Sequence, residues 1–304
     1  MREAAKAGGR APFNGVEKGM RHWLLTTGVA AIVAWGPAFA SDLPTYKAPP
    51  APVFTWTGFY VGVNGGYGWN GSSVSYAPND SNALFNTCGG SPGGTCIPPA
   101  SFNVGGGLAG GQIGYNYQLD SNWLVGVEAD YDWSGARGTG NSNFSLNSVG
   151  PLTFVAKESI GSFGTLRGRL GFVPMSPLLI YATGGLAYGA VSEHASTPPL
   201  PGPPGLGGYF SGGHGYYCYA GTGVSCFTGS SSKTNVGWTL GAGGEYAITN
   251  NITFRVEYLY VNLGRPNGLD SVATASGGSA PSSFTANFAA ASLNVVRAGL
   301  NWKF

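Results

Sequence analysis

Charged residues are scarce in this sequence. Only 9% of the 304 residues are Asp, Glu, Lys or Arg, whereas an ordinary soluble domain carries about 25%. Aromatic residues make up 13% and glycine occupies 53 positions, so the composition departs from that of an ordinary soluble domain. The sequence also has no basic patch or Lys/Arg-rich helix. It therefore predicts no nucleic-acid partner.

The net charge of the chain is close to zero, and its hydropathy argues against a second class of protein. The formal charge is +2, but five of the fifteen basic and two of the thirteen acidic residues lie in residues 1–40. The remaining chain carries ten basic against eleven acidic residues, a net charge of −1. The mean hydropathy of the full 304-residue chain is +0.03. A value so close to zero argues against a helical membrane protein.

Long hydrophobic runs are almost missing, and the single one extends from Trp23 to Ala40. Lys18 and Arg21 precede it, and it ends in residues 38–40, a small-x-small cleavage site. This order predicts a secretory signal peptide and a mature chain that begins at Ser41. The alternative is a single transmembrane anchor, which the cleavage site makes the weaker interpretation.

The stretch Trp123 to Trp133, WLVGVEADYDW, shows the pattern that indicates the fold class of the mature chain. Alternate residues are apolar or aromatic, and Glu128, Asp130 and Asp132 lie between them. Because successive side chains of a strand point to opposite faces, one face is apolar and the other acidic. About 9–11 tilted residues cross a bilayer, and aromatic side chains mark its interfaces. Carboxylates cannot face hydrocarbon, so the acidic face predicts a lumen.

The same alternation recurs along the chain. Four long segments, predicted as loops 70–101, 134–157, 192–235 and 264–283, alternate with three short turns. This pattern predicts an all-β fold, an eight-stranded antiparallel transmembrane β-barrel with short periplasmic turns and long extracellular loops. Closure removes the open edges that lipid does not tolerate. The predicted strands are residues 59–69, 107–118, 123–133, 162–172, 178–190, 238–248, 254–260 and 296–304.

Domain boundaries and aromatic positions follow from this topology. Met20 directly precedes the basic region, so an upstream extension is expected before it. With a periplasmic N-terminus, the aromatic residues of the strands gather in two belts, for example Trp123 at the periplasmic rim and Trp133 at the outer rim. The predicted organisation is 1–19, upstream extension; 20–40, signal peptide; 41–55, Pro-rich periplasmic lead-in; and 56–304, outer-membrane β-barrel.

The charged residues of the inward faces nearly balance in sign. An enzyme could use such carboxylates as an acid/base set, but eight strands enclose only enough room for side chains. Because unpaired buried charge is costly, we expect a lumenal ion-pair network instead. Its predicted members are Glu128, Asp130, Asp132, Arg167, Arg169, Glu245, Arg255, Glu257 and Arg297.

Cysteine and histidine are also rare. Cys88 and Cys96 lie in the first predicted loop, and Cys218 and Cys226 in the third. The cell surface is oxidising, so disulfides are expected; three connectivities are open, and closure within each loop costs the least chain entropy. His194 and His214 share the third loop with Cys218 and Cys226 but without compact ligand spacing, so we expect no metal site and no cofactor.

The chain ends in GLNWKF, with Trp302 and Phe304 at alternate positions. This ending resembles the carboxy-terminal signal that the barrel-assembly machinery recognises in outer-membrane proteins. The machinery is therefore an expected partner of the last strand, and outer-membrane lipid is the other.

Four further motifs strengthen a family resemblance: WTGFYVGVNGGYGWN (56–70), GQIGYNYQL (111–119), WLVGVEADYDW (123–133) and GTLRGRLGF (164–172). Together they resemble the small outer-membrane immunogenic-protein family of Gram-negative bacteria, which are porin-like eight-stranded barrels. The resemblance covers roughly residues 54–304. It implies an abundant, surface-exposed barrel of the outer membrane. Some relatives bind hemin or host molecules, but no loop motif here carries that property over.

The sequence thus predicts a non-enzymatic protein with a structural and surface-interaction role, whose exposed loops are open to a host or surface ligand. The alternative is a narrow porin-like channel for small solutes. An outer-membrane lipid- or peptide-cleaving enzyme would need a nucleophile–base pair near the outer rim. The sequence offers no convincing Ser/His/Asp grouping there.

Overall fold

The computed structural model describes residues 54–80, 97–146, 150–199, 205–211, 214–220, 225, 227–266, 269–273 and 283–304, without the side chains of 144–146, 150–152, 205–211, 214–220 and 271–273. The predicted upstream extension and signal peptide, and all but the last two residues of the lead-in, lie outside these ranges. Within them, no helix combines the length and the apolar character needed to cross a membrane.

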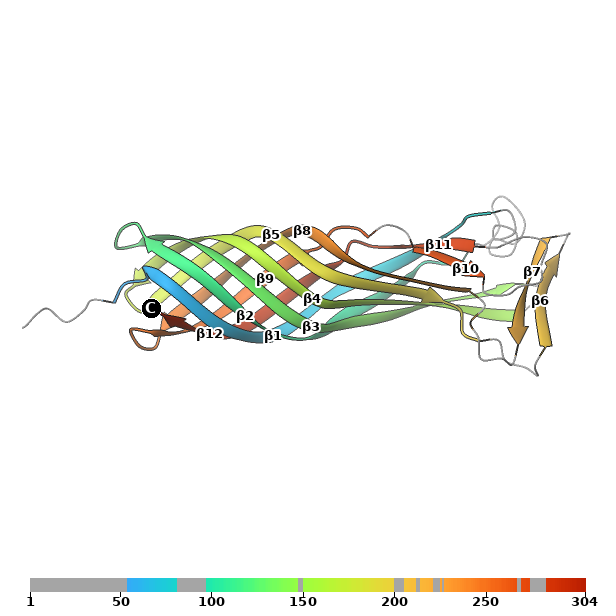
Figure 1. Ribbon diagram of the computed structural model, residues 1–304, viewed down its shortest axis with the longest axis horizontal. Helices are drawn as coiled ribbons and strands as arrows, with labels where there is room; N and C mark the ends of the chain where they lie inside the picture. The colour runs from blue at the N-terminus through green and yellow to red at the C-terminus, as the bar shows by residue number, and fades with distance from the viewer. Residues whose placement is uncertain are drawn as a thin grey trace, which may run out of the picture. The chain divides into compact units, whose positions relative to one another are not determined.

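Eight antiparallel strands close into a barrel (Figure 1). Each strand pairs with the next in the ring, and the last pairs with the first, so every strand has two neighbours. The predicted eight-stranded barrel is confirmed. The strands of the ring are β1 (Gly58–Pro78), β2 (Ala100–Gln118), β3 (Trp123–Leu146), β4 (Gly150–Met175), β5 (Leu178–Ser196), β8 (Phe227–Ala247), β9 (Ile252–Asn262) and β12 (Ser292–Lys303).

Short turns join the strands at the periplasmic end, where the C-terminus also lies (Figure 1). In the turn between β2 and β3, a carboxylate oxygen of Asp120 accepts hydrogen bonds from the backbone N–H groups of Asn122 and Trp123, each at 2.7 Å. These bonds stabilise the charged carboxylate and lower the pKa of Asp120. The side chain thus supplies turn contacts that the backbone alone lacks.

The part of the barrel between the periplasmic turns and the outer aromatic residues, such as Trp133 and Trp238, has an apolar outer face. We call it the membrane section. Val63 and Leu186 are 65% and 59% exposed, whereas Asp132 on the inner face is fully buried. Aromatic rings meet across strands at both rims. At the periplasmic rim the ring centroids of Trp123 and Phe172 lie 5.4 Å apart, and at the outer rim those of Trp238 and Tyr260 lie equally close, at 5.4 Å.

The strands continue well beyond the outer aromatic rim. β3 and β4 stay paired from Ala136 with Ile160 to Leu146 with Gly150. The predicted loop at 134–157 is therefore wrong, and most of it is an antiparallel ribbon. β5 also continues to Ser196, into the loop predicted at 192–235.

Two additional strands complete this upper part, which we call the extracellular section. β10 (Leu269–Ala273) and β11 (Ser283–Phe288) pair with each other. β10 also pairs with β8, and β11 with β1. They thus occupy the places that β9 and β12 hold below, so the wall again closes on eight strands. A separate two-stranded hairpin consists of β6 (Gly205–Ser211) and β7 (His214–Ala220).

The interior of the extracellular section is apolar. The ring of Phe154 packs edge-on against Phe284 with centroids 4.7 Å apart, and Phe227 and Tyr76 complete an aromatic cluster. The outer face carries polar residues such as Thr139 and Lys157. The pattern of the membrane section is therefore inverted, because water now surrounds the wall. Because the outward residues here are polar, the sequence lacks the alternating apolar face of a transmembrane strand, and loops were predicted.

Candidate functional site

The lumen of the membrane section brings all nine predicted charged residues together. Each occupies an inward position of its strand, because residues i and i+2 share a face. β3 supplies three carboxylates, β4 two guanidinium groups, and β8, β9 and β12 the remainder. They are Glu128, Asp130 and Asp132 from β3, Arg167 and Arg169 from β4, Glu245 from β8, Arg255 and Glu257 from β9, and Arg297 from β12.

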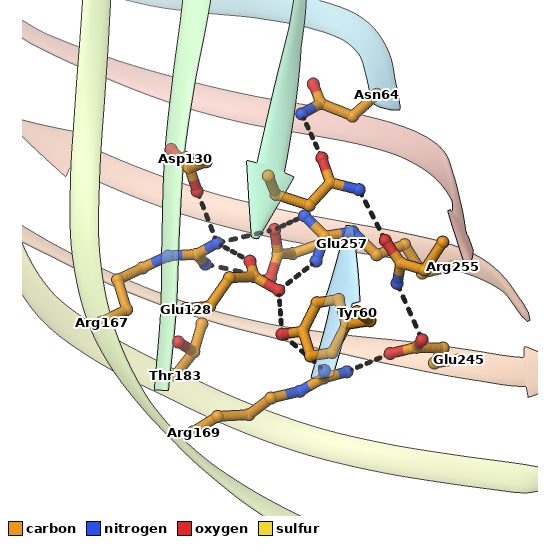
Figure 2. Close-up of polar contacts among 12 residues, drawn as sticks. Tyr60, Asn64, Glu128, Asp130, Arg167, Arg169, Thr183, Glu245, Arg255 and Glu257 are labelled. Atoms are coloured by element: carbon orange, nitrogen blue, oxygen red, sulfur yellow. Dashed lines mark hydrogen bonds and ion pairs between the residues drawn. The ribbon is translucent and has the colours of Figure 1, made fainter. Parts of the chain in front are cut away.

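Two carboxylates and two guanidinium groups alternate at the centre of the lumen (Figure 2). Arg167 lies 2.5 Å from Glu128 Oε1 and 3.0 Å from Glu257 Oε1. Arg255 lies 2.5 Å from Glu128 Oε2 and 3.5 Å from Glu257 Oε2. Each of these side chains is at most 3% exposed, so the pairs lie away from solvent. Pairing of both signs is what a buried charge needs.

Arg297 extends the network toward the extracellular side. Its guanidinium group lies 2.6 Å from Asp132 Oδ2, 2.7 Å from Asp130 Oδ2 and 2.8 Å from Glu257 Oε2. Asp130 Oδ2 also accepts a hydrogen bond of 2.7 Å from Arg167. Arg297 thereby connects β12, the last strand of the chain, to β3 across the lumen.

Arg169 extends the network toward the periplasm. It forms an ion pair with Glu245, and its guanidinium carbon lies 3.6 Å from the centroid of the Tyr181 ring. Glu245 also accepts hydrogen bonds from Thr253 Oγ1 at 2.5 Å and from Asn301 Nδ2 at 2.8 Å. Each of these side chains comes from a different strand, so together they connect the wall of the barrel across its interior.

Uncharged polar residues link the charged ones, and they are not among the predicted site residues. Tyr60 Oη donates a 2.6 Å hydrogen bond to Glu128 and accepts one of 3.4 Å from Arg169 (Figure 2). A chain of hydrogen bonds also leads to Glu245. Asn64 Nδ2 donates to Gln112 Oε1 at 2.8 Å, Gln112 Nε2 donates to Asn301 Oδ1 at 2.7 Å, and Asn301 Nδ2 donates to Glu245 Oε1 at 2.8 Å. Their inward positions in the alternating pattern were the signal that could have found them.

Apolar layers bound the network at both ends. The periplasmic layer consists of Trp56, Leu124, Val173, Leu179 and Tyr181, with Phe54 and Ala247 packed against it. On the extracellular side, residues including Phe163, Leu259, Val261, Leu293 and Val295 belong to the large core cluster. Trp56 and Leu124 are 2% and 0% exposed. Water in the periplasm is thus separated from the ion pairs by packed side chains.

The remaining predicted site residues lie elsewhere. Trp302 and Phe304 face outward at the periplasmic rim, 51% and 71% exposed, and the Phe304 N–H donates a 3.0 Å hydrogen bond to the Phe59 carbonyl. Cys88, Cys96 and Cys226, and the side chain of Cys218, lie outside the described part of the chain. In that part, no group of three or more His, Cys, Asp or Glu side chains is arranged to hold a metal ion.

A second buried polar group lies in the extracellular section. Glu158 and Glu193 are direct cross-strand partners on β4 and β5, and are 3% and 4% exposed. Ser72 Oγ donates a 2.6 Å hydrogen bond to Glu158 Oε2. Burial raises the pKa of Glu193 to about 7, repulsion from Glu158 adds to the rise, and Lys233 opposes it. Burial also raises the pKa of Glu158.

We expect the extracellular section to lose stability as the pH rises. A carboxyl whose folded-state pKa is raised favours folding below its ordinary pKa of 4.5, and that contribution is lost as the pH rises through about 7. Amide hydrogen exchange on the upper parts of β4 and β5, corrected for the intrinsic rate, should therefore accelerate between about pH 5 and about pH 8. Glu193→Gln should remove most of this dependence. A dependence that persists unchanged in this variant would contradict the assignment.

Comparison with known proteins places the chain in a family. Residues 43–304 match the family described as outer membrane protein beta-barrel domain. The chain is 34% identical to the 31 kDa outer-membrane immunogenic protein of Brucella melitensis over 286 residues, covering 92% of this chain and 99% of that protein. It is 30% identical to the 22 kDa outer membrane protein of Rhizobium leguminosarum over 218 residues, covering 71% and 68%.

Among solved structures, the outer membrane protein OprG from Pseudomonas aeruginosa is similar, with a TM-score of 0.39 and 13% identity over 82% of this chain and 96% of that one. The family match and the sequence relatives confirm the predicted family and outer-membrane location. This chain belongs to the outer membrane protein beta-barrel domain family.

Proposed function

We propose that this protein is a closed, non-catalytic barrel that anchors a surface-exposed extracellular section in the outer membrane. The observation that carries the proposal is the ionic network at the centre of the lumen, with an apolar layer on either side of it. Arg167 and Arg297, at the centre of the network, are 1% exposed. A passage for solutes would need these side chains to be hydrated.

The contacts of the lumenal carboxylates also favour a structural role over catalysis. Glu128 and Glu257 each contact more than one guanidinium group. A general acid or base must be within reach of a substrate proton, and these carboxylates are enclosed by their ion-pair partners. The pairs instead connect β3, β4, β9 and β12, so they hold the wall together from inside.

The extracellular section supports the surface-interaction part of the proposal. Its strands rise beyond the aromatic rim and present polar side chains to water, while its interior is packed. The name of the Brucella melitensis relative describes that protein as immunogenic. We propose that the extracellular section gives this chain a comparable exposed surface.

Conductance in planar lipid bilayers tests the closed lumen. The purified protein is expected to give no stable, nanosiemens-scale channel, because ion pairs and two apolar layers fill the path. Trp56→Ala serves as the matched variant, since it thins the periplasmic layer and leaves the ionic network intact. Its conductance should stay at the same low level. Large stable openings of the unaltered protein would instead favour the narrow porin-like channel.

A further inference from the structure

A groove on the outer surface of the extracellular section carries basic and hydroxyl side chains. Its volume is about 740 Å³, and it lies over β3, β4, β5 and β8. We call it the basic groove, and the residues that matter here are Arg137, Lys157, His194, Ser159, Ser192 and Ser232. These outward side chains are distinct from the inward residues of the ionic network.

Strand register brings the cations of the basic groove together. Lys157 on β4 is the direct cross-strand partner of His194 on β5. Arg137 on β3 is the partner of Ser159 on β4, and Ser159 that of Ser192 on β5. Neighbouring strands lie about 4.8 Å apart. One anionic group can therefore contact side chains from two or three strands at once.

The electrostatics of the groove favour an anion. Arg137 and Lys157 are exposed, and neither makes an ion pair with a carboxylate among the described residues. Two carboxylates border the groove, those of Glu158 and Glu193, but they are 3% and 4% exposed and lie on the inward face of their strands. The outward side chains thus offer donors and positive charge.

The height of the groove above the membrane identifies the kind of anion. Arg137 follows the outer-rim Trp133 by four residues on β3, and Ser192 follows Tyr188 by four residues on β5. At about 3.3 Å per residue, this is about 13 Å along the strand. Aromatic belts lie at the headgroup level of a bilayer. The groove therefore lies where the headgroups of the outer leaflet reach the wall of the barrel.

We propose that the basic groove binds the phosphate groups of lipopolysaccharide, the anionic glycolipid of the outer leaflet. Guanidinium and ammonium groups are the preferred side-chain partners of phosphate, and the serine hydroxyls can donate to phosphate or sugar oxygens. The proposal depends on the placement of the barrel in the outer membrane. It does not depend on a closed lumen, so the conductance experiment and this one can fail separately.

Lipopolysaccharide binding by the refolded barrel in nanodiscs tests the proposal. Arg137→Gln and Lys157→Gln are each expected to weaken binding about fivefold, because each removes one basic contact with an anionic lipid. Arg265→Gln is the matched control, since it removes another exposed cation from a different groove of the extracellular section. Heat-modifiable migration on gels establishes that each variant is folded.

Two further arms distinguish the source of the phosphate. Lipopolysaccharide with its phosphates removed enzymatically should bind more weakly to the unaltered protein, and should no longer distinguish Arg137→Gln from Arg265→Gln. Inorganic phosphate at millimolar concentration should not displace the intact glycolipid. Displacement by inorganic phosphate, equal effects of the three substitutions, or indifference to dephosphorylation would each overturn the proposal.

Discussion

Arg167→Met is expected to destabilise the membrane section by about 3–5 kcal/mol, the cost of removing one partner from a set of buried ion pairs. The Arg167 guanidinium group contacts Glu128, Asp130 and Glu257, and its side chain is fully buried. Methionine carries no charge, so Glu128, Asp130 and Glu257 would keep only their ion pairs with Arg255 and Arg297. The buried network would then hold one more uncompensated negative charge. Reversible urea unfolding in detergent or lipid vesicles measures the loss.

The control for this substitution lies on the outer surface. Arg265→Met makes the same chemical change at an exposed position outside the basic groove, where substitutions usually alter stability by less than about 0.5 kcal/mol. If the Arg167 variant does not refold, the fraction of each variant that reaches the outer membrane in cells gives the same comparison. Equal behaviour of the two variants would show that the ionic network contributes little to assembly.

Phe154→Ala is expected to open the extracellular section while the membrane section stays intact. Phe154 is 2% exposed and contacts Phe284, Phe227 and Tyr76. Truncation of such a ring costs about 3–5 kcal/mol through lost packing and the cavity that remains. Limited proteolysis of whole cells should therefore cut the upper parts of β3 and β4 in the variant and spare them in the unaltered protein.

Its neighbour provides the matched control. Val155→Ala removes methyl groups from the outward side of the same strand, where Val155 is half-buried, and should leave the proteolysis pattern nearly unchanged. Urea unfolding of the membrane section should be the same in both variants. Joint loss of both sections in Phe154→Ala would mean that they unfold as one cooperative unit.

The membrane section could be predicted from the sequence because lipid imposes a strict rule on each strand. Every outward residue must be apolar, so charged residues such as Arg169 and Glu257 can only face the lumen. That rule gives the facing of each side chain without any knowledge of its partner. It also gives the strand count, since short turns and long segments alternate.

Partners within the lumen could not be predicted in the same way. Arg255 and Glu128 are separated by 127 positions in the chain, and their contact depends on closure of the barrel. Gln112 bonds to Asn64 and Asn301, and such a hydrogen bond between uncharged groups leaves no pattern in the sequence. Facing is a local property of a strand, whereas pairing across the lumen depends on the whole ring.

The strands of the extracellular section were not predicted, because water surrounds this section whereas lipid surrounds the membrane section. Above the outer rim, Ala136, Ala156 and Ile160 turn inward while Arg137 and Lys157 face water. The period of two persists there, but its polarity is reversed relative to the lipid-exposed part. β4 changes register with both neighbours in this region, between Ile160 and Ser162 on the β5 side. Such an irregularity re-aims the strand at the change of surroundings.

Substitution of β10 and β11 for β9 and β12 in the upper wall has a consequence for association between molecules. Without this pair, β1 would leave the backbone N–H and C=O groups from Val74 to Pro78 unpaired on this side, and β8 those of Phe227 and Thr228. Such rows are templates for the edges of other chains. We therefore expect β10 and β11 to limit edge-to-edge pairing between crowded copies of the protein at the cell surface.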